Sequence, residues 1–313
     1  MDSIVIFLSA AVVAGTPLLF ATLGEILTEK VGNLNLGVEG MMLMGAVMGF
    51  LLAFKTGNLM FAVIGAAAAG AFGALIYAFL TIGLRANQVV SGLALTIFGT
   101  GFSSVIGQSA QLIGEKVPNT IDRFFDVLPV PGLNNIPFIG PIFFNHDPFV
   151  YLGYILSIIL GIYLYNTNKG LNLRAVGENP ACADVASINV NLYKYINVLI
   201  GGALCGLGGA YLSLVYIPTW QENVTAGRGW IAVALVIFAA WNPYKAIFGA
   251  YLFGGLSIVA FRFEILTRYI PQYFIDMLPY LVTIIVLVVV SMRKNKKNLA
   301  PMALGNAYFR EER

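Results

Sequence analysis

The chain has 313 residues, of which 58% are apolar and 11% charged, and its mean hydropathy is +0.82. Soluble globular proteins average about 45–50% apolar and about 25% charged residues, so this composition excludes most soluble enzymes and indicates a polytopic membrane protein. The net charge of +3 is too small to indicate nucleic acid binding, and two cysteines are too few for a disulfide-built extracellular module.

Apolar segments predict nine membrane-spanning helices, or ten, in one all-α transmembrane domain over residues 1–313. In chain order they lie near 4–23, 34–54, 59–84, 89–107, 148–166, 195–216, 229–241, 246–263 and 277–292. The third is long, so it is expected to be tilted or broken. The seventh provides only roughly 20 Å of helix, so it is either a half-helix or extends into its flanks.

The positions of Lys and Arg predict sidedness, because cytoplasmic loops carry an excess of both. With the N-terminus outside, twelve of these residues fall on the inner side and six on the outer side. This orientation places the Pro-rich stretch 108–147 outside as a folded loop. It places the 167–193 loop and the 293–313 tail in the cytoplasm. Within the inner loop, 181–186 is helix-compatible with little apolar surface, which is typical of a helix that docks on a partner.

Motifs typical of enzymes are missing from the sequence. No G-x-x-x-x-G-K-[ST] phosphate loop occurs, so the chain is not expected to hydrolyse ATP by itself. H-E-x-x-H and G-x-S-x-G are also missing, and His146 in the outer loop is the only histidine. We therefore expect no catalytic residue, no metal site and no cofactor.

Several polar side chains within or beside the spans are candidate pore or gating residues, because polar groups there usually face a cavity or a partner. They are Asn35, Glu39, Gln88, Ser91 and Arg228. Each has a plainer alternative. Asn33 or Asn35 would cap the second span, and the helix dipole would then stabilise Glu39. Arg228 would pack or snorkel to the headgroups. The polar side of the fourth span would form hydrogen bonds between helices.

Two Gly-rich segments, GNLNLGVEGMMLMGAVMGF and TAGRGWIAVALVIFAAW, each join a turn to an apolar helix. Five predicted spans separate them, and an odd number places the two copies in opposite orientations, as in inverted-repeat transporters. Chance similarity between Gly-rich apolar segments is the alternative. Gly45 and Gly49, like Gly202 and Gly206, stand four apart, which predicts close packing between helices.

Six stretches between about Pro17 and Arg313 resemble one family, the ABC-importer permeases of ribose and branched-chain amino-acid systems. They are GNLNLGVEGMMLMGA, ANQVVSGLAL, GLNLRAVGENPACADVASINV, TAGRGWIAVALVIFAAWNP, MLPYLVT and APMALGNAYFREER. The GRGW segment and the ALG-x-x-Y-x-x-EER tail are most similar to the nucleoside permeases that work with basic-membrane-protein-type lipoproteins. The resemblance implies a bacterial cytoplasmic-membrane protein of inverted-repeat fold that forms half of a pore.

The resemblance also implies that the inner loop carries a coupling helix, which docks on the ATPase of the importer. The matching positions are Arg174, Glu178, Asn179, Pro180, Ala183, Asp184 and Ser187. Pro180 suits the first turn of a helix, and Ala183 is small enough to lie deep in a groove. Glu178 and Asp184 suit ion pairs at the rim of that groove. The related motif commonly has Gly in place of Ser187, and Ser adopts a left-handed conformation less readily.

Such importers contain a second, related permease, here expected to form a heterodimer, an ATPase with two nucleotide-binding domains, and an extracytoplasmic nucleoside-binding lipoprotein. Two alternatives stay open. One is a permease of the same family for a simple sugar such as ribose. The other is an ATP-independent secondary transporter or channel, which would need an ion-coupling carboxylate in mid-membrane. No clear carboxylate of that kind appears away from the predicted span ends.

Overall fold

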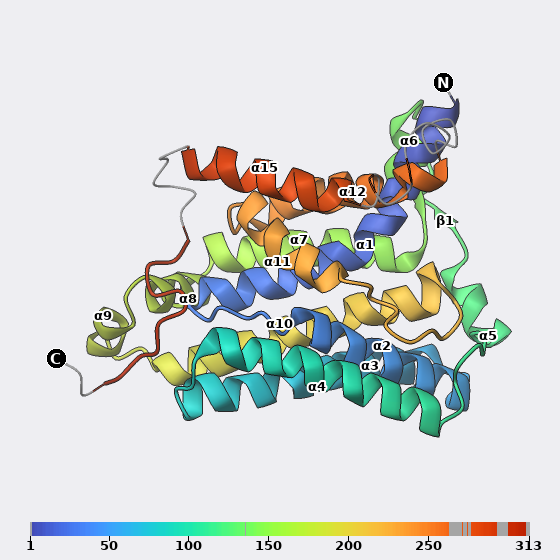
Figure 1. The fold of residues 1–313 in the computed structure, drawn as a ribbon. Helices are drawn as coiled ribbons and strands as arrows, with labels where there is room; N and C mark the ends of the chain where they lie inside the picture. Colours follow the sequence, from blue (N-terminus) through green and yellow to red (C-terminus); the bar gives the residue numbers. More distant parts are fainter. Residues whose placement is uncertain are drawn as a thin grey trace.

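The computed structural model describes residues 2–134, 136–262, 271, 274, 277–292 and 300–310. The longer helices are α1 (Asp2–Lys30), α2 (Val38–Thr56), α3 (Leu59–Ala78), α4 (Gln88–Ser109), α7 (Pro148–Asn166), α10 (Val190–Tyr211), α12 (Pro243–Arg262) and α15 (Leu278–Met292). The shorter helices are α5 (Asn119–Asp122), α6 (Ile139–Phe143), α8 (Asn168–Glu178), α9 (Pro180–Val185) and α11 (Arg228–Phe238). Strands β1 (Leu128–Pro129) and β2 (Asn145–His146) pair antiparallel. The described chain is a helical bundle (Figure 1), which confirms the predicted all-α class.

Each of the nine predicted apolar segments coincides with a helix. Within the described residues, six helices are long and apolar enough to cross a membrane: α1, α2, α3, α4, α7 and α10. The predicted seventh segment is the 11-residue helix α11, so it is a half-helix. The predicted eighth and ninth segments are α12 and α15. The first segment was predicted too short, because α1 continues beyond residue 23 to Lys30.

The local sequence explains where several helices begin. The side chain of Asp147 accepts hydrogen bonds from the first N–H groups of α7, and Pro148 follows it with a fixed backbone angle. Asn58 and Asn87 cap α3 and α4 in the same way. At their far ends, α3 and α10 widen into π-turns, η1 (Phe79–Gly83) and η3 (Leu212–Tyr216), and irregular segments follow both.

Helix α10 packs against α1, α2 and α3 in the core of the bundle. Glycines make this packing close. A Cβ added to Gly45 of α2 would lie 2.3 Å from the Cα of Gly206 of α10, and one added to Gly70 of α3 would lie 2.8 Å from the same atom. Because these distances are shorter than a van der Waals contact, the three backbones touch where no side chain fits. The predicted packing role of Gly45 and Gly206 is confirmed.

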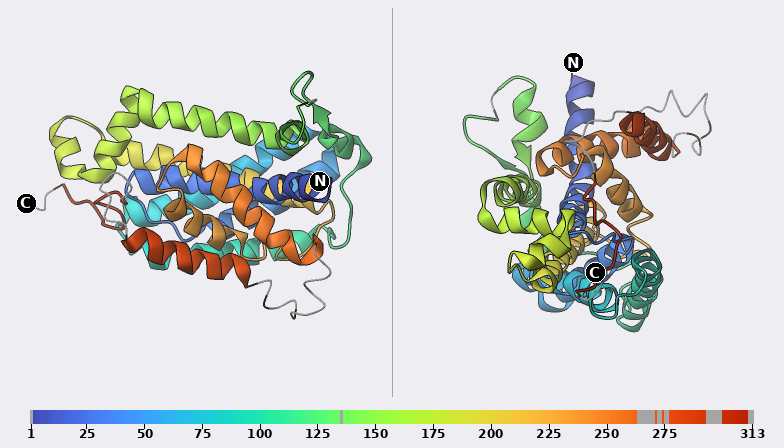
Figure 2. Two further views of the ribbon diagram at one scale, coloured as in Figure 1. Left: turned by 90° about the horizontal axis from the view of Figure 1, so that it is seen from above. Right: turned by 90° about the vertical axis from the view of Figure 1, so that its left-hand side faces the viewer.

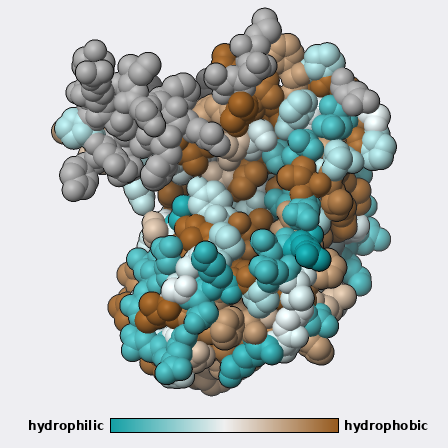
Figure 3. Space-filling view, turned by 90° about the vertical axis from the view of Figure 1, so that its right-hand side faces the viewer, coloured by the Kyte–Doolittle hydropathy of each residue, from teal (hydrophilic) through white to brown (hydrophobic). Residues whose placement is uncertain are grey.

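The bundle has two ends, which we name after short helices. The α9 end carries α8, α9 and the tail 300–310, whereas the α5 end carries α5, α6 and the strand pair (Figures 1 and 2). Figure 3 shows that many hydrophilic side chains lie across the α5 end, interspersed with apolar ones. Which end faces the cytoplasm stays a prediction. The EER sequence at 311–313 and the basic stretch 293–299 lie outside the described residues.

The stretch 108–147 is folded at the α5 end, as predicted. Gly114 N donates to Trp220 O at 3.1 Å and Val117 N donates to Pro218 O at 3.1 Å, so this stretch is joined to the segment before α11. The imidazole Nε2 of His146 lies 2.7 Å from Ile142 O. Burial lowers the pKa of His146 below its ordinary value of 6.5.

Candidate functional site

The first turns of α2 and α11 meet at the carboxylate of Glu39, which is buried. Its Oε1 accepts hydrogen bonds from Thr225 Oγ1 at 2.5 Å and from Gly227 N at 2.8 Å. Its Oε2 accepts one from Gly229 N at 2.6 Å. Because Gly227 and Gly229 flank the start of α11, the carboxylate lies at the positive end of that helix dipole. We call these four residues the Glu39 junction.

The backbone around the Glu39 junction is strained and tightly packed. Asn223, Ala226 and Gly227 have φ values of 53°, 46° and 84°, in the left-handed region. For residues other than Gly this conformation costs of order 1–3 kcal/mol and persists only where surrounding contacts hold it. A Cβ added to Gly229 would lie 2.5 Å from the Cα of Glu39, so the two helix starts touch.

The two helices run away from the junction in opposite directions. Helix α2 ends at the α5 end, where a Cβ on Gly57 would lie 3.5 Å from Thr120 Oγ1. Helix α11 leads to the α9 end, where Trp241 Nε1 donates to Glu29 Oε2 at 2.5 Å, one residue before the end of α1. The two similar Gly-rich segments therefore begin oppositely directed helices, as the inverted-repeat prediction requires.

An irregular segment, 31–37, leads from α1 to the junction and is held by buried polar side chains. Asn35 N and Nδ2 donate to the carboxylate of Glu25 at 3.2 and 3.1 Å. Leu34 N donates to Gln88 Oε1 at 2.6 Å. Thr96 Oγ1 donates to Leu36 O at 3.0 Å. The polar side of α4 thus forms hydrogen bonds to this irregular segment, whereas the sequence analysis expected bonds between helices.

The capping prediction for α2 was wrong in detail. The N-cap residue of α2 is Gly37, which has no side chain and so cannot form a capping hydrogen bond. Asn35 Oδ1 accepts from Gly37 N at 2.9 Å, and so stabilises the turn that precedes the helix. Asn33 Nδ2 lies 3.5 Å from Thr81 Oγ1, away from the first turn of α2.

Arg228 is half-buried and contacts residues of its own chain. Its guanidinium lies 5.3 Å from the ring centre of Tyr216, and its Nη1 donates to the carbonyls of Val224 and Thr225 at 3.4 and 3.3 Å. These contacts agree with the packing alternative. Ser91 is buried on α4, at 6% exposure, one turn beyond Gln88.

Two buried carboxylates were missed by the sequence analysis. Glu25 and Glu29 are 0% and 2% exposed in the last two turns of α1, just beyond residue 23, where the predicted span ended. Both accept hydrogen bonds, from Asn35 and from Trp241, and so tie α1 to the 31–37 segment and to the end of α11. The spacing of Leu23, Ile26 and Leu27 continues the helical pattern and was the available signal.

The predicted coupling loop folds as two short helices at the α9 end. Asn179 caps α9 by accepting from Cys182 N at 3.0 Å, and Pro180 is its first residue, as predicted. Ser187 has a φ of 63°, so it adopts the left-handed conformation usually taken by Gly. Ser187 N donates to Asp184 O at 2.9 Å and Ile188 N to Ala183 O at 3.0 Å, which completes a Schellman motif.

The orientation of α9 differs from the prediction. Ala183 is only 3% exposed, because it packs within its own chain, so its side chain does not face a partner. The exposed side of α9 carries Ala181, Cys182 and Val185, and Val185 is 88% exposed. We call these three residues the α9 face. The prediction that Ala183 lies deep in a partner's groove was wrong.

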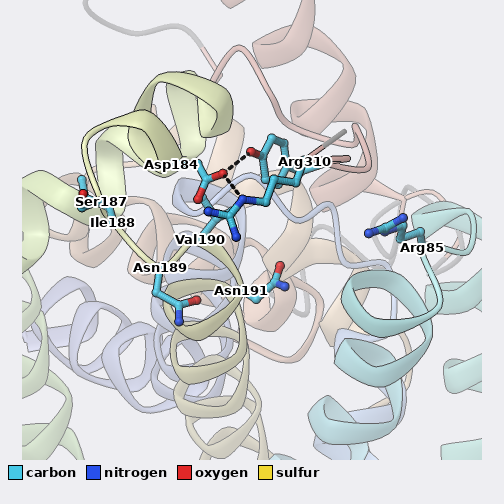
Figure 4. Close-up of a pocket in the computed structure, with 9 residues that line it drawn as sticks. Arg85, Asp184, Ser187, Ile188, Asn189, Val190, Asn191 and Arg310 are labelled. Carbon is cyan, nitrogen blue, oxygen red and sulfur yellow. Dashed lines mark hydrogen bonds and ion pairs between the residues drawn. The ribbon is translucent and has the colours of Figure 1, made fainter. Parts of the chain in front are cut away.

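The charged residues of the loop also have partners in this chain. Glu178 Oε2 accepts from Met302 N at 3.3 Å, and Asp184 Oδ2 accepts from Tyr308 and pairs with Arg310. Arg174 lies 5.6 Å from the ring centre of Tyr165. A cavity of about 500 Å³ lies beside these groups, lined by the start of α10 together with Arg85, Tyr308 and Arg310 (Figure 4).

This fold defines a polytopic α-helical membrane protein with two oppositely directed helix starts inside the bundle and a helical loop at one end. The profile of the family described as "Branched-chain amino acid transport system / permease component" matches residues 7–287. The chain therefore belongs to this permease family.

Three relatives match over nearly their whole length. TsgC13 of Haloferax volcanii, provisionally named as a glucose ABC transporter permease, is 39% identical over 97% of this chain and 97% of its own. The guanosine ABC transporter permease NupQ of Bacillus subtilis is 34% identical over 98% of both chains. The nucleoside ABC transporter permease NupC of Lactococcus lactis is 31% identical over 100% of this chain and 99% of its own.

Proposed function

We propose that this ABC-type permease imports nucleosides and forms half of the translocation pore. The observation that carries the proposal is the full-length similarity to NupC and NupQ, two permeases named for nucleoside substrates. The chain contains no phosphate-loop sequence, so ATP hydrolysis falls to a separate subunit. We expect that subunit to carry two nucleotide-binding domains and to work with a second permease and a nucleoside-binding lipoprotein.

A sugar is the second candidate substrate, because TsgC13 shares a higher sequence identity with this chain than either nucleoside permease does. Uptake of radiolabelled uridine and guanosine, measured in cells that express the complete transporter, separates the two. We expect nucleoside uptake that excess unlabelled nucleoside abolishes and excess glucose or ribose leaves unchanged. Uptake of labelled glucose or ribose, competed by sugar alone, would assign the sugar substrate instead.

We infer that the α9 end faces the cytoplasm and docks the ATPase, with the N-terminus outside. Three observations support this inference. The Lys and Arg distribution favours it, with twelve residues on the inner side and six on the outer side. The sequence of the 167–193 loop resembles the coupling loop of related permeases. The α9 face is exposed and apolar, and Val185 lacks cover from the described chain.

We further propose that the Glu39 junction belongs to the gate of the pore. Helices that start inside the membrane and direct their positive ends at an anionic group are a recurring feature of transport sites. Here one carboxylate joins both helix starts, and the strained turn at Ala226 and Gly227 provides backbone that a small displacement would rearrange. Asn35 and Gln88 act by holding the 31–37 segment beside the junction.

A further inference from the structure

The tail 300–310 crosses the α9 end of the bundle in irregular backbone (Figure 2). It is anchored by packing as well as by hydrogen bonds, because Ala303 is 8% exposed and Leu304 packs against the core. Ala303 N donates to Gly177 O, the penultimate residue of α8, at 3.0 Å. The tail therefore belongs to the folded structure at this end and closes over the helical loop.

The contacts of this tail fall into two groups, and the first group is made with the predicted coupling loop. Asp184 of α9 is the main partner: its Oδ2 accepts from Tyr308 Oη at 3.0 Å and lies 2.9 Å from Arg310 Nε (Figure 4). Glu178 Oε2 accepts from Met302 N at 3.3 Å. The tail thus contacts the loop at two places, the end of α8 through Glu178 and α9 through Asp184.

The other contacts are made with the opposite side of the same surface. Gly305 N donates to Gly32 O at 3.3 Å, and Gln88 Nε2 lies 3.5 Å from Asn306 O. The guanidinium of Arg85, which precedes α4, lies 4.6 Å from the ring centre of Phe309. Gly32 is the second residue of the 31–37 segment, so these contacts reach the part of the chain that leads to the Glu39 junction.

The two groups of contacts meet at a point with no spare room. A Cβ added to Gly177 would lie 2.1 Å from Lys30 O, at the end of α1, and one added to Gly32 would lie 3.5 Å from Ala303 O. Three backbones, from α8, from the end of α1 and from the tail, are therefore in direct contact. A displacement of α8 would therefore press on the end of α1, beside the 31–37 segment, or break its hydrogen bond with the tail.

We propose that the tail 300–310 is a coupling strap, which transmits movement of α9 to the 31–37 segment and the start of α4. In this role Asp184 is a positioning residue that fixes α9 through Tyr308 and Arg310, and the α9 face makes the contact with the ATPase. The proposal rests on the proposed function, since it needs an ATPase that moves α9. It differs from the expectation that Asp184 pairs with basic residues of the ATPase.

The test uses the complete transporter in proteoliposomes and measures substrate uptake and ATP hydrolysis together. The double variant Tyr308→Phe, Arg310→Glu removes one hydrogen bond and places a like charge opposite Asp184. We expect it to capture the ATPase at the wild-type level while uptake per ATP hydrolysed falls about fivefold or more. The matched variant Arg310→Lys keeps the charge and is expected to keep most of the coupling.

A charge swap protects the test against a variant that simply fails to assemble. Asp184→Arg alone is expected to uncouple transport, and Asp184→Arg combined with Arg310→Asp is expected to restore coupling, because the pair is re-formed with its charges exchanged. Coupling that is normal in the Tyr308→Phe, Arg310→Glu variant, or a swap that restores nothing, would overturn the strap. Loss of ATPase capture in the double variant would assign these residues to docking. A wild-type complex that neither binds nor needs an ATPase would instead overturn the proposed function.

Discussion

Glu39→Gln tests the Glu39 junction most directly, because it keeps the size of the side chain and removes its charge. In the protein the carboxylate accepts from Thr225 Oγ1 and Gly227 N through one oxygen and from Gly229 N through the other. The amide of Gln can satisfy only one of these two positions. Its NH2 group then faces an N–H or O–H donor, and at least one buried donor is left unpaired.

The magnitude follows from the contacts that are lost. A hydrogen bond to a charged group contributes about 1.5–3 kcal/mol, and an unpaired buried donor costs about 1–3 kcal/mol. These two contributions overlap, so we expect Glu39→Gln to lower the free energy of unfolding by about 2–4 kcal/mol. Thr225→Val is the matched control, because it removes one donor and leaves the carboxylate with two backbone partners. Its expected cost is about 1.5 kcal/mol, the lower end of the range for a hydrogen bond to a charged group, because the carboxylate keeps its other two donors.

Thermal unfolding of the purified protein in detergent, followed by size-exclusion fluorescence, measures both variants. A change of 1 kcal/mol corresponds to about 2–4 °C in Tm for chains of about 150–250 residues and to somewhat less for a longer chain, so Glu39→Gln should lower Tm by several degrees. Thr225→Val should lower it by less. The reasoning is refuted if Glu39→Gln leaves Tm within about 1 °C of the wild type, or if Thr225→Val is the more damaging change.

Three further predictions follow from the two ends of the bundle. Val185→Trp should give a stable, membrane-inserted permease that fails to capture the ATPase. Ala183→Trp should instead destabilise the protein itself by about 1–3 kcal/mol, because the Ala183 site is already packed. Equal Tm values for the two variants would contradict this prediction. In intact cells, a cysteine introduced at Asn134 should react with an impermeant thiol reagent and the native Cys182 should not; reversed labelling would reverse the topology. Because burial lowers the pKa of His146, its unfolded form binds the proton more tightly, so stability should fall as pH drops through about 6.5. Proteolysis of the 139–147 segment at pH 7.5 and pH 5.5 measures this effect, which His146→Gln should remove.

The positions of the membrane helices could be predicted from the sequence because each depends on a local apolar run. The short seventh segment and the start of α9 at Pro180 could also be predicted from local sequence, because Gly227 and Asn179 are residues that favour helix starts. The opposite directions of α2 and α11 followed from counting spans. For these features the chain carries the information within about twenty residues.

The missed features depend on partners that are distant along the chain. Glu25 and Glu29 looked like loop residues because their burial requires Asn35 and Trp241 to supply hydrogen bonds. The orientation of Ala183 was unpredictable because α9 is a single short helix of mostly small residues, with no apolar stripe to indicate its buried side. Asp184 pairs with Arg310, 126 residues further along the chain, and no local pattern signals that contact.

The central claim, that this chain forms half of the pore of an ATP-driven importer, is tested most directly by reconstitution. The chain is purified alone and with the second permease, the ATPase and the binding lipoprotein, and each preparation is placed in liposomes with labelled nucleoside outside. We predict concentrative uptake only for the complete assembly with ATP on the ATPase side, and neither ATP hydrolysis nor uptake for the chain alone. Uptake by the chain alone, driven by an imposed proton or sodium gradient, would contradict the account and assign the buried carboxylates of α1 to ion coupling.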